Sequence, residues 1–395
     1  SSCMGYGKLA KGVSEAEAKR RLQSVMPSSN RKKHFQGKTP SVFIGSHNYP
    51  KVNTGVLSPQ HLGSPEMMDS PRKWYEEEFS IEKIASLRTS LVNSKKRFQV
   101  DDTDKFLNNT QEVAMARKPV DVEVELEKKP GANISGGRVK PVSASGDVEE
   151  FLLTENPSVE RKVEKAFYDN DLKAETAVSE LYSKGVDNYK ILQSMSTGML
   201  GEKESRELVP TRWSITATDD IISKNVRRNV KDFQELGQIE YYNNEFLGNE
   251  FHIFLIPGRW EYELIEMKRP GSVWNAAENT YIAQNYESYS GRTSYAEETA
   301  GAFYAARLGV LEFLRRRQRQ SKVLILRDVK PEYWAPLGVW VIRETVRNAF
   351  KNGGSEMDSF KDVKFRIGNE FKFLYNRLKK ESKMIGGRQS SLQNF

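Results

Sequence analysis

The sequence contains a single cysteine, Cys3, in 395 residues. One cysteine cannot form a disulfide within the chain, so the composition fits a reducing, intracellular setting, and we expect a cytoplasmic protein. No apolar run approaches the roughly 20 residues that a membrane-spanning helix needs, so we expect no membrane partner. The first residues also lack the apolar core of a signal peptide.

Several catalytic fingerprints are absent as well. The sequence has no phosphate-binding Walker loop, no glycine-rich dinucleotide fingerprint and no Ser/His/Asp spacing typical of a hydrolase. No motif therefore assigns a nucleophile, an acid or a base, and we predict no cofactor.

Charge is distributed unevenly along the chain. The formal net charge is +8, but residues 1–40 carry 9 Lys/Arg against 2 acids, and residues 301–395 carry 20 against 9. The middle of the chain is therefore acidic. Basic segments attract polyanions because binding releases counterions, and nucleic acid is the commonest polyanion in a cell. The alternative is that these lysines and arginines only line solvated helix faces.

The hydrophobic pattern predicts an α+β fold. Residues 41–44 and 322–329 are typical of buried strands, and residues 120–126 alternate valine or leucine with carboxylates, as in a strand with one wet face. "FHIFLIPGRWEYELIEMKRPGSVW" predicts a strand pair that turns near Pro257 and Gly258. Residues 158–184 predict one helix, and apolar residues from Phe360 to Leu378 form a long helical stripe.

These elements predict a mixed, sheet-containing N-terminal domain followed by a mostly helical C-terminal domain. The expected parts are a basic, weakly structured arm (1–40), an α+β domain (41–282), a helical domain (283–386) and a flexible tail (387–395).

The tail carries the most specific short pattern. Gln389, Leu392 and Phe395 lie three residues apart and follow Gly386 and Gly387. Three-residue spacing is the period of a 3₁₀ turn, which would place Leu392 and Phe395 side by side as an apolar plug, with Gln389 as a polar anchor. The pattern resembles the peptide by which repair proteins dock on the DNA sliding clamp, proliferating cell nuclear antigen (PCNA).

Four longer stretches resemble the archaeal Nre family of DNA repair proteins: "PSVFIGSHNYPKVNTGVLSP", "VPTRWSITATDD", "LIPGRWEYELIEMKRPGSVW" and "LGVLEFLRRRQRQSKVLILRDVKPEYWAPLGVWVIRE". The resemblance implies an archaeal protein that acts in DNA damage repair, binds DNA and is recruited to the clamp through the terminal motif. Some members open with a cysteine-rich, zinc-finger-like element. This chain keeps only Cys3 there, so we expect no zinc site.

A cluster of basic residues is the main DNA-binding prediction: Arg315, Arg316, Arg317, Arg319 and Lys322. Such clusters contact phosphates, although cations at the end of a helix are also favourable without any DNA. Arg227, Arg228 and Lys231 form a smaller group of the same kind.

The alternative function is a clamp-tethered repair enzyme, a metal-dependent nuclease or a nucleotide-transferring enzyme. Glu266 and Lys268 form a Glu-x-Lys triplet on a predicted strand, which nucleases use to hold Mg²⁺ and to activate water. Glu263 precedes them, and Asp219 in "TATDD" would supply the upstream carboxylate. Arg212 lies on the strand predicted for "TRWSITATDD". A solvated strand face explains the triplet equally well, and Mg²⁺ is expected only under this alternative.

Overall fold

The computed structural model describes residues 15–26, 31–60, 65–131 and 144–386. The chain divides into two compact units: Ala16–Asn225, and Ser1–Glu15 together with Val226–Phe395. Among the helices in the described ranges, none combines the length and the apolar character that crossing a membrane requires.

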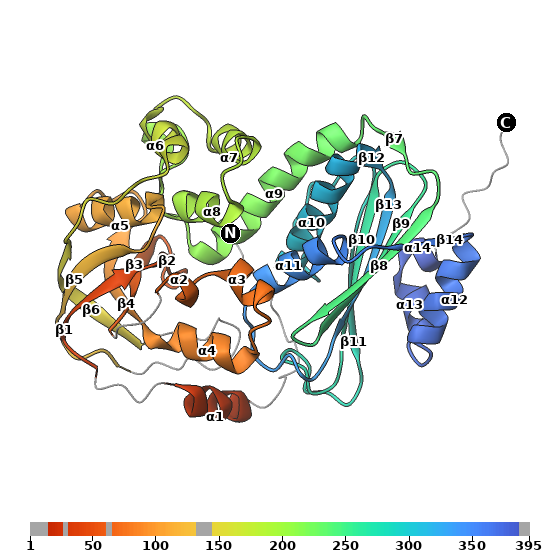
Figure 1. Cartoon of the computed structure of the whole chain (residues 1–395), viewed down its shortest axis with the longest axis horizontal. Coiled ribbons are helices and arrows are strands. Elements are labelled where there is room, and N and C mark those ends of the chain that lie inside the picture. Colours follow the sequence, from red (N-terminus) through yellow and green to blue (C-terminus); the bar gives the residue numbers. More distant parts are fainter. Residues whose placement is uncertain (1–14, 27–30, 61–64, 132–143, 387–395) are drawn as a thin grey trace. The chain divides into compact units, whose positions relative to one another are not determined.

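A six-stranded mixed sheet organises the Ala16–Asn225 unit, with the order β1-β5-β6-β4-β3-β2 (Figure 1). Its strands are β1 (His34–Thr39), β2 (Ser41–Ile44), β3 (Lys51–Pro59), β4 (Leu91–Gln99), β5 (Val120–Leu126) and β6 (Ala144–Leu153). Only β4 and β6 pair in parallel. The alternation in β5 is confirmed, because its valines and Leu126 are buried while the acidic residues between them are half-buried.

Helices make up the rest of this unit, and polar side chains mark where several of them begin. Ser80, Asp104 and Asp187 each accept a hydrogen bond from a backbone N–H in the first turn of α4, α5 and α8. The helices are α1 (Glu15–Val25), α2 (Pro65–Met68), α3 (Pro71–Glu76), α4 (Ile81–Ser90), α5 (Lys105–Met115), α6 (Arg161–Tyr168), α7 (Ala174–Ser183), α8 (Asn188–Ser196), the 3₁₀ turn η1 (Lys203–Ser205) and α9 (Thr211–Val230), which continues into the other unit.

Two expectations for this unit were wrong. The segment 158–184 forms two helices, because the side chain of Asp169 caps the N–H of Asp171 and Arg206 binds the Asp169 carbonyl, which diverts the backbone from helical pairing. The expected basic arm contains β1, which pairs along its whole length with β5. Lys38 and Asp121 form an ion pair of 3.0 Å across that pairing.

The second unit is built on another six-stranded mixed sheet, with the order β11-β10-β13-β9-β8-β14. The strands are β8 (Ile239–Phe246), β9 (Asn249–Ile256), β10 (Glu261–Lys268), β11 (Tyr281–Glu287), β13 (Lys322–Val329) and β14 (Ser355–Met357); β7 (Gln234–Glu235) and β12 (Arg319–Gln320) form a small separate ladder. β9 and β10 were expected to pair with each other, but β13 lies between them, parallel to β10 and antiparallel to β9.

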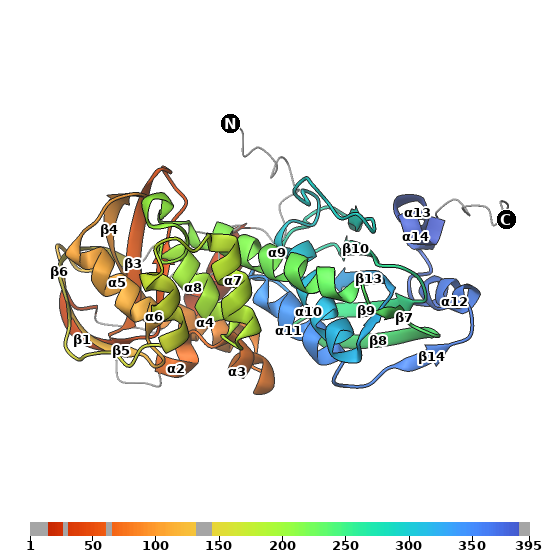
Figure 2. The same cartoon turned by 90° about the horizontal axis from the view of Figure 1, so that it is seen from above.

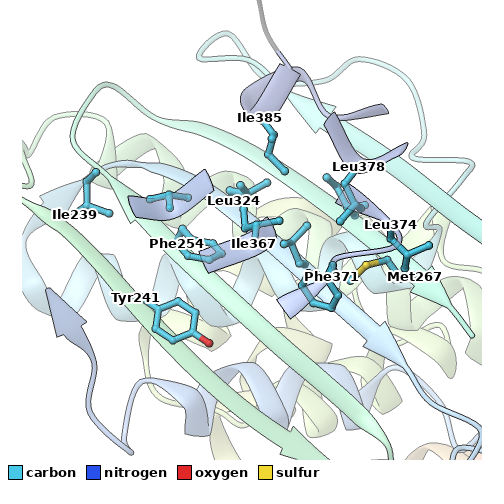
Figure 3. Close-up of a cluster of buried hydrophobic side chains, with 13 residues drawn as sticks. Ile239, Tyr241, Phe254, Met267, Leu324, Ile367, Phe371, Leu374, Leu378 and Ile385 are labelled. Carbon is cyan, nitrogen blue, oxygen red and sulfur yellow. The ribbon is translucent and has the colours of Figure 1, made fainter. Parts of the chain in front are cut away.

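Helices cover both faces of this second sheet (Figure 1 and Figure 2). Tyr242 of β8 packs on Phe313 and Phe350, on the side of α10 (Gly301–Arg317) and α11 (Trp340–Ala349). Its neighbour Tyr241 faces the opposite side and belongs to the apolar cluster under α12 (Phe360–Glu370), α13 (Tyr375–Glu381) and α14 (Lys383–Gly386), shown in Figure 3. Adjacent residues of a strand point to opposite faces, so β8 contributes side chains to the apolar packing on both faces of the sheet.

The expectation of a mostly helical C-terminal domain is not confirmed. Residues 283–386 supply β12, β13, β14 and most of β11, and β13 lies in the middle of the sheet. The apolar stripe from Phe360 to Leu378 is buried as predicted, although it is divided between α12, α13 and the turn that joins them.

Candidate nucleic-acid interface

The two glutamates predicted on β10 point to opposite faces of the sheet. Glu263 is completely buried and faces the C-terminal helices. Its carboxylate accepts hydrogen bonds from Ser382 Oγ (2.8 Å) and from the backbone N–H groups of Lys383 (2.7 Å) and Met384 (3.0 Å). Glu263 therefore fixes the beginning of α14.

Glu266 lies on the other face, in a buried network of charges. It pairs with Arg327 of β13 and with Lys268, whose Nζ is 3.3 Å from the carboxylate. Arg327 also donates to Asn249 Oδ1, with an Nε distance of 3.1 Å. All four side chains are buried. The strand expected for the Glu-x-Lys triplet is confirmed, but the lysine and the carboxylate are bound to each other and to an arginine.

Arg212 and Asp219 lie on α9, in the Ala16–Asn225 unit, whereas Glu263, Glu266 and Lys268 belong to the other unit. The prediction of a strand for "TRWSITATDD" was wrong. The segment is helical, and its polar residues make contacts from the helix. Ser214 Oγ donates to the carbonyl of Val209, and Thr218 Oγ1 contacts Met195 Sδ one turn later. Their i, i+4 spacing buries both hydroxyls on one helix face.

The arginines predicted to contact DNA occupy the end of α10. Arg315, Arg316 and Arg317 form its last turn, and Gln318 ends the helix in the left-handed region (φ 50°). Arg317 makes an ion pair with Glu240 (3.1 Å), while about half of its side chain stays exposed. The favourable placement of cations at a helix C-terminus is thus realised, and Arg316 and Arg317 are exposed there.

Two further cations lie over the ring of Tyr289. Lys231 Nζ lies 3.9 Å from the centre of the Tyr289 ring, and Arg259 Cζ lies 3.7 Å from it. Arg259 is exposed on the turn between β9 and β10. Cation–π contacts of this kind hold long basic side chains in place while their charge stays accessible.

The side chain of Gln320 connects the segments that carry these cations. Its Nε2 donates to the carbonyls of Lys231 (3.0 Å) and Phe233 (2.6 Å), and its Oε1 accepts from the N–H of Trp260 (3.1 Å). Arg319 precedes Gln320, and Lys322 follows two residues later and pairs with Glu261 (3.0 Å). Figure 1 shows β7 and β12 beside the C-terminal ends of α9 and α10. We call the set Lys231, Arg259, Tyr289, Arg319 and Lys322 the basic edge.

Arg227 does not belong to the basic edge. It binds the completely buried Glu287 (2.5 Å), which also binds Arg307 and accepts from Trp260 Nε1 (3.0 Å). Burial alone would raise the pKa of Glu287, but the charges of Arg307 and Arg227 outweigh it and hold the pKa below its usual value. Arg227 is therefore part of the internal structure, unlike its exposed neighbour Arg228.

The sequence interpretation missed Arg259 and Tyr289. One signal was present, because Arg259 follows Pro257 and Gly258 in a turn between two buried strands, and binding residues concentrate in such turns. The contact of Arg259 with Tyr289, 30 residues further on, has no local signature. The predicted clamp-binding residues Gln389, Leu392 and Phe395 lie outside the described residues.

Comparisons with known proteins identify the family. The sequence matches the model of the archaeal Nre N-terminal region over residues 15–275 and that of the archaeal Nre C-terminal region over residues 287–395. The chain belongs to the archaeal Nre family.

Three relatives are similar over most of their length. One named DNA repair protein NreA, from Haloferax volcanii, is 42% identical over 371 residues (91% of this chain, 88% of the relative). A second protein named DNA repair protein NreA, from Archaeoglobus fulgidus, is 38% identical (90% and 88%), and one named DNA repair protein NreB, from the same organism, is 32% identical (95% and 95%). No solved structure matches this chain.

Proposed function

We propose that this protein is a DNA repair factor that binds DNA through the basic edge and the adjoining arginines of α10. It is recruited to the sliding clamp (PCNA) through Gln389, Leu392 and Phe395. The observation that carries the repair role is membership of the archaeal Nre family, with relatives named DNA repair proteins that cover about 90% of the chain.

The basic edge suits DNA without demanding a particular base sequence. Lys231, Arg259 and Arg319 come from three different segments, and Gln320 holds those segments together. Cations arranged in this way contact successive phosphates, which position a protein on DNA but carry little sequence information. Glu261 neutralises part of the charge of Lys322, so we assign the larger share of phosphate contact to the other cations.

The clamp contact adds a second point of attachment. Burial of one leucine and one phenylalanine contributes about 1.5–3 kcal/mol each before the ordering of the segment is subtracted. The tail alone should therefore bind with micromolar or weaker affinity, which is about −8 kcal/mol at most. A clamp that encircles DNA would raise the local concentration of the basic edge on the same duplex.

The DNA-binding part is tested by fluorescence anisotropy of labelled duplex and single-stranded DNA over a series of salt concentrations. Arg259→Ala with Arg319→Ala should weaken binding and lower the salt slope on duplex DNA by about two, because each phosphate contact contributes about 0.9. The matched control is Lys95→Ala with Lys96→Ala on β4, which removes the same charge in the other unit. Equal affinity and slope in both double variants would contradict the assignment.

The clamp part is tested by calorimetry against a purified archaeal clamp. Leu392→Ala with Phe395→Ala should abolish binding, whereas Gln389→Ala should weaken it less because it removes no apolar area. DNA affinity and melting temperature should stay unchanged in all these variants. Equal clamp affinity for the wild-type and the Leu392/Phe395 variant would exclude the terminal motif as the docking site.

A further inference from the structure

Three potential metal ligands meet on the face of the second sheet that carries α12–α14. Glu250 and His252 alternate on β9 and therefore share this face, and Glu370 is the last residue of α12. One ligand atom from each, a carboxylate oxygen or an imidazole nitrogen, lies within 4.8 Å of the other two. The imidazole Nε2 is 3.4 Å from Glu250 Oε1.

One imidazole nitrogen has a hydrogen-bond partner, and the other faces Glu250. His252 is 3% exposed, and its Nδ1 lies 2.8 Å from the hydroxyl of Tyr241. Its Nε2 is completely buried and has no hydrogen-bond partner among the described residues. A buried ring nitrogen without a hydrogen bond is rare in a folded protein, and a carboxylate oxygen of Glu250 lies 3.4 Å from this one.

The surrounding residues orient these ligands. Lys330 holds Glu250 Oε2 at 2.9 Å, which leaves Oε1 facing His252. The ring of Phe371 packs edge-on against the imidazole, with centroids 5.1 Å apart, and Figure 3 shows Phe371 and Tyr241 in the same apolar cluster. A hydrogen-bond partner on the other ring nitrogen is the usual support of a metal-binding histidine, and Tyr241 occupies that place.

A simple ion pair between His252 and Glu250 explains the arrangement less well. The Nε2–Oε1 separation of 3.4 Å is longer than an ordinary hydrogen bond, so such a pair leaves the buried Nε2 without a hydrogen-bond partner among the described residues. Glu370 also stands at the C-terminal end of α12, where the helix dipole disfavours an anion. A cation between these groups would relieve both costs, despite the positive charges of Lys330 and Arg366 nearby.

We propose that Glu250, His252 and Glu370 bind one divalent first-row transition-metal ion, which joins β9 to the end of α12. One imidazole and two carboxylates form a mixed nitrogen and oxygen donor set, which suits zinc, cobalt, iron or manganese better than the all-oxygen coordination that magnesium and calcium prefer. The site is separate from the basic edge and from the Glu266 network, and it involves no cysteine.

The site is tested on the full chain carrying Cys3→Ser, after treatment with a chelator, so that the single thiol does not contribute. Titration with Co²⁺, followed by its visible absorption, and with Zn²⁺, followed by competition with a chromophoric chelator, should each show one equivalent. Mn²⁺ should bind more weakly than Co²⁺. Saturating Zn²⁺ should raise the melting temperature, because the ion binds the folded state.

The variants separate the site from adventitious binding. Glu370→Gln should weaken Zn²⁺ binding at least about tenfold and leave the melting temperature of the metal-free protein unchanged, since Glu370 is exposed. Tyr241→Phe should weaken binding about 10–100-fold, as loss of a supporting hydrogen bond does. His34→Gln is the matched control, because His34 forms an exposed pair with Glu123. Absence of stoichiometric binding, or equal Zn²⁺ affinity in Glu370→Gln and His34→Gln, would overturn the proposal.

Discussion

The backbone N–H of Lys383 donates a 2.7 Å hydrogen bond to the carboxylate of Glu263, 120 positions earlier in the chain. Ser382 and Met384 bind the other carboxylate oxygen. One buried side chain of β10 therefore satisfies two backbone donors in the first turn of α14, where N–H groups have no partner within the helix. This contact attaches the last described helix to the sheet, three residues before Gln389 of the predicted clamp motif.

Glu263→Gln should loosen that attachment. The amide side chain keeps the size but loses the charge, and it replaces one acceptor oxygen by a donor that faces the N–H of either Lys383 or Met384. We expect the free energy of unfolding to fall by about 1–3 kcal/mol and the amides of residues 383–385 to exchange faster with deuterium. Glu261→Gln on the same strand is the control, since Glu261 binds Lys322 and the hydroxyl of Tyr286. Unchanged exchange at 383–385 would contradict the role assigned to Glu263.

The buried pairing of Glu287 with Arg227 and Arg307 should be important for stability. Glu287→Gln removes the buried carboxylate that Arg227 and Arg307 share, and breaking a buried ion pair costs about 3–5 kcal/mol. Because the pKa of Glu287 is held below its usual value, this contribution is present above the unfolded pKa and is lost as the pH falls through the folded pKa. Urea unfolding at pH 7 and pH 3 should show a smaller difference between wild type and variant at the lower pH.

Lys190 should make stability depend on pH in the alkaline range. It donates to the carbonyls of Ala114 (2.8 Å) and Ala116 at the end of α5, and burial lowers its pKa to about 8 from 10.5. Between these two values the unfolded chain holds a proton that the folded chain has released, so the free energy of unfolding rises with pH. The rise amounts to at most about 3 kcal/mol, at 1.36 kcal/mol for each pKa unit.

Comparison with Lys190→Met isolates this effect from other titrating groups. Urea unfolding at pH 7, 8, 9 and 10 should show the wild type gaining stability relative to the variant. Parallel curves for the two proteins would mean that the ammonium group of Lys190 is not desolvated.

Tyr289 should contribute to DNA binding by holding Lys231 and Arg259. Tyr289→Ala removes the ring and lets both side chains move, so DNA affinity should fall by about threefold to tenfold, in line with cation–π energies of about 0.5–1 kcal/mol per exposed contact. Tyr289→Phe keeps the ring and should bind DNA as the wild type does. Anisotropy at fixed salt distinguishes them, and equal losses in the two variants would point to the hydroxyl instead.

The sequence predicted the elements whose pattern is local. The alternation in β5, the buried run of β13 and the apolar stripe of α12 and α13 each follow from one short segment. The helix α9 was read as a strand because Ser214 and Thr218 lie at positions that fit both a period of two and a period of four. Burial of both hydroxyls on one face distinguishes the helix from the strand, and burial is known only once the unit has folded.

Contacts between distant segments could not be predicted in the same way. The basic edge depends on Gln320 bonding to Lys231 and Trp260, and the Glu250–His252 pair meets Glu370 from a helix 118 residues later. The Glu-x-His alternation on β9 was the only local sign of the proposed metal site. Which residues meet is determined by strand order, and strand order is not encoded in any short window of residues.

The place of β13 in the sheet has a consequence for the synthesis of the protein. When residues up to 287 have left the ribosome, the β8–β9 and β10–β11 hairpins can form. They cannot become one sheet until residues 322–329 emerge, because β13 is the strand that pairs with both β9 and β10. Both hairpins expose apolar strand edges during that interval, a situation that invites aggregation and engages chaperones. For the same reason, cutting the chain between the two family regions, at 275–287, divides the second sheet between two fragments, and the second unit should form only when both fragments are expressed together.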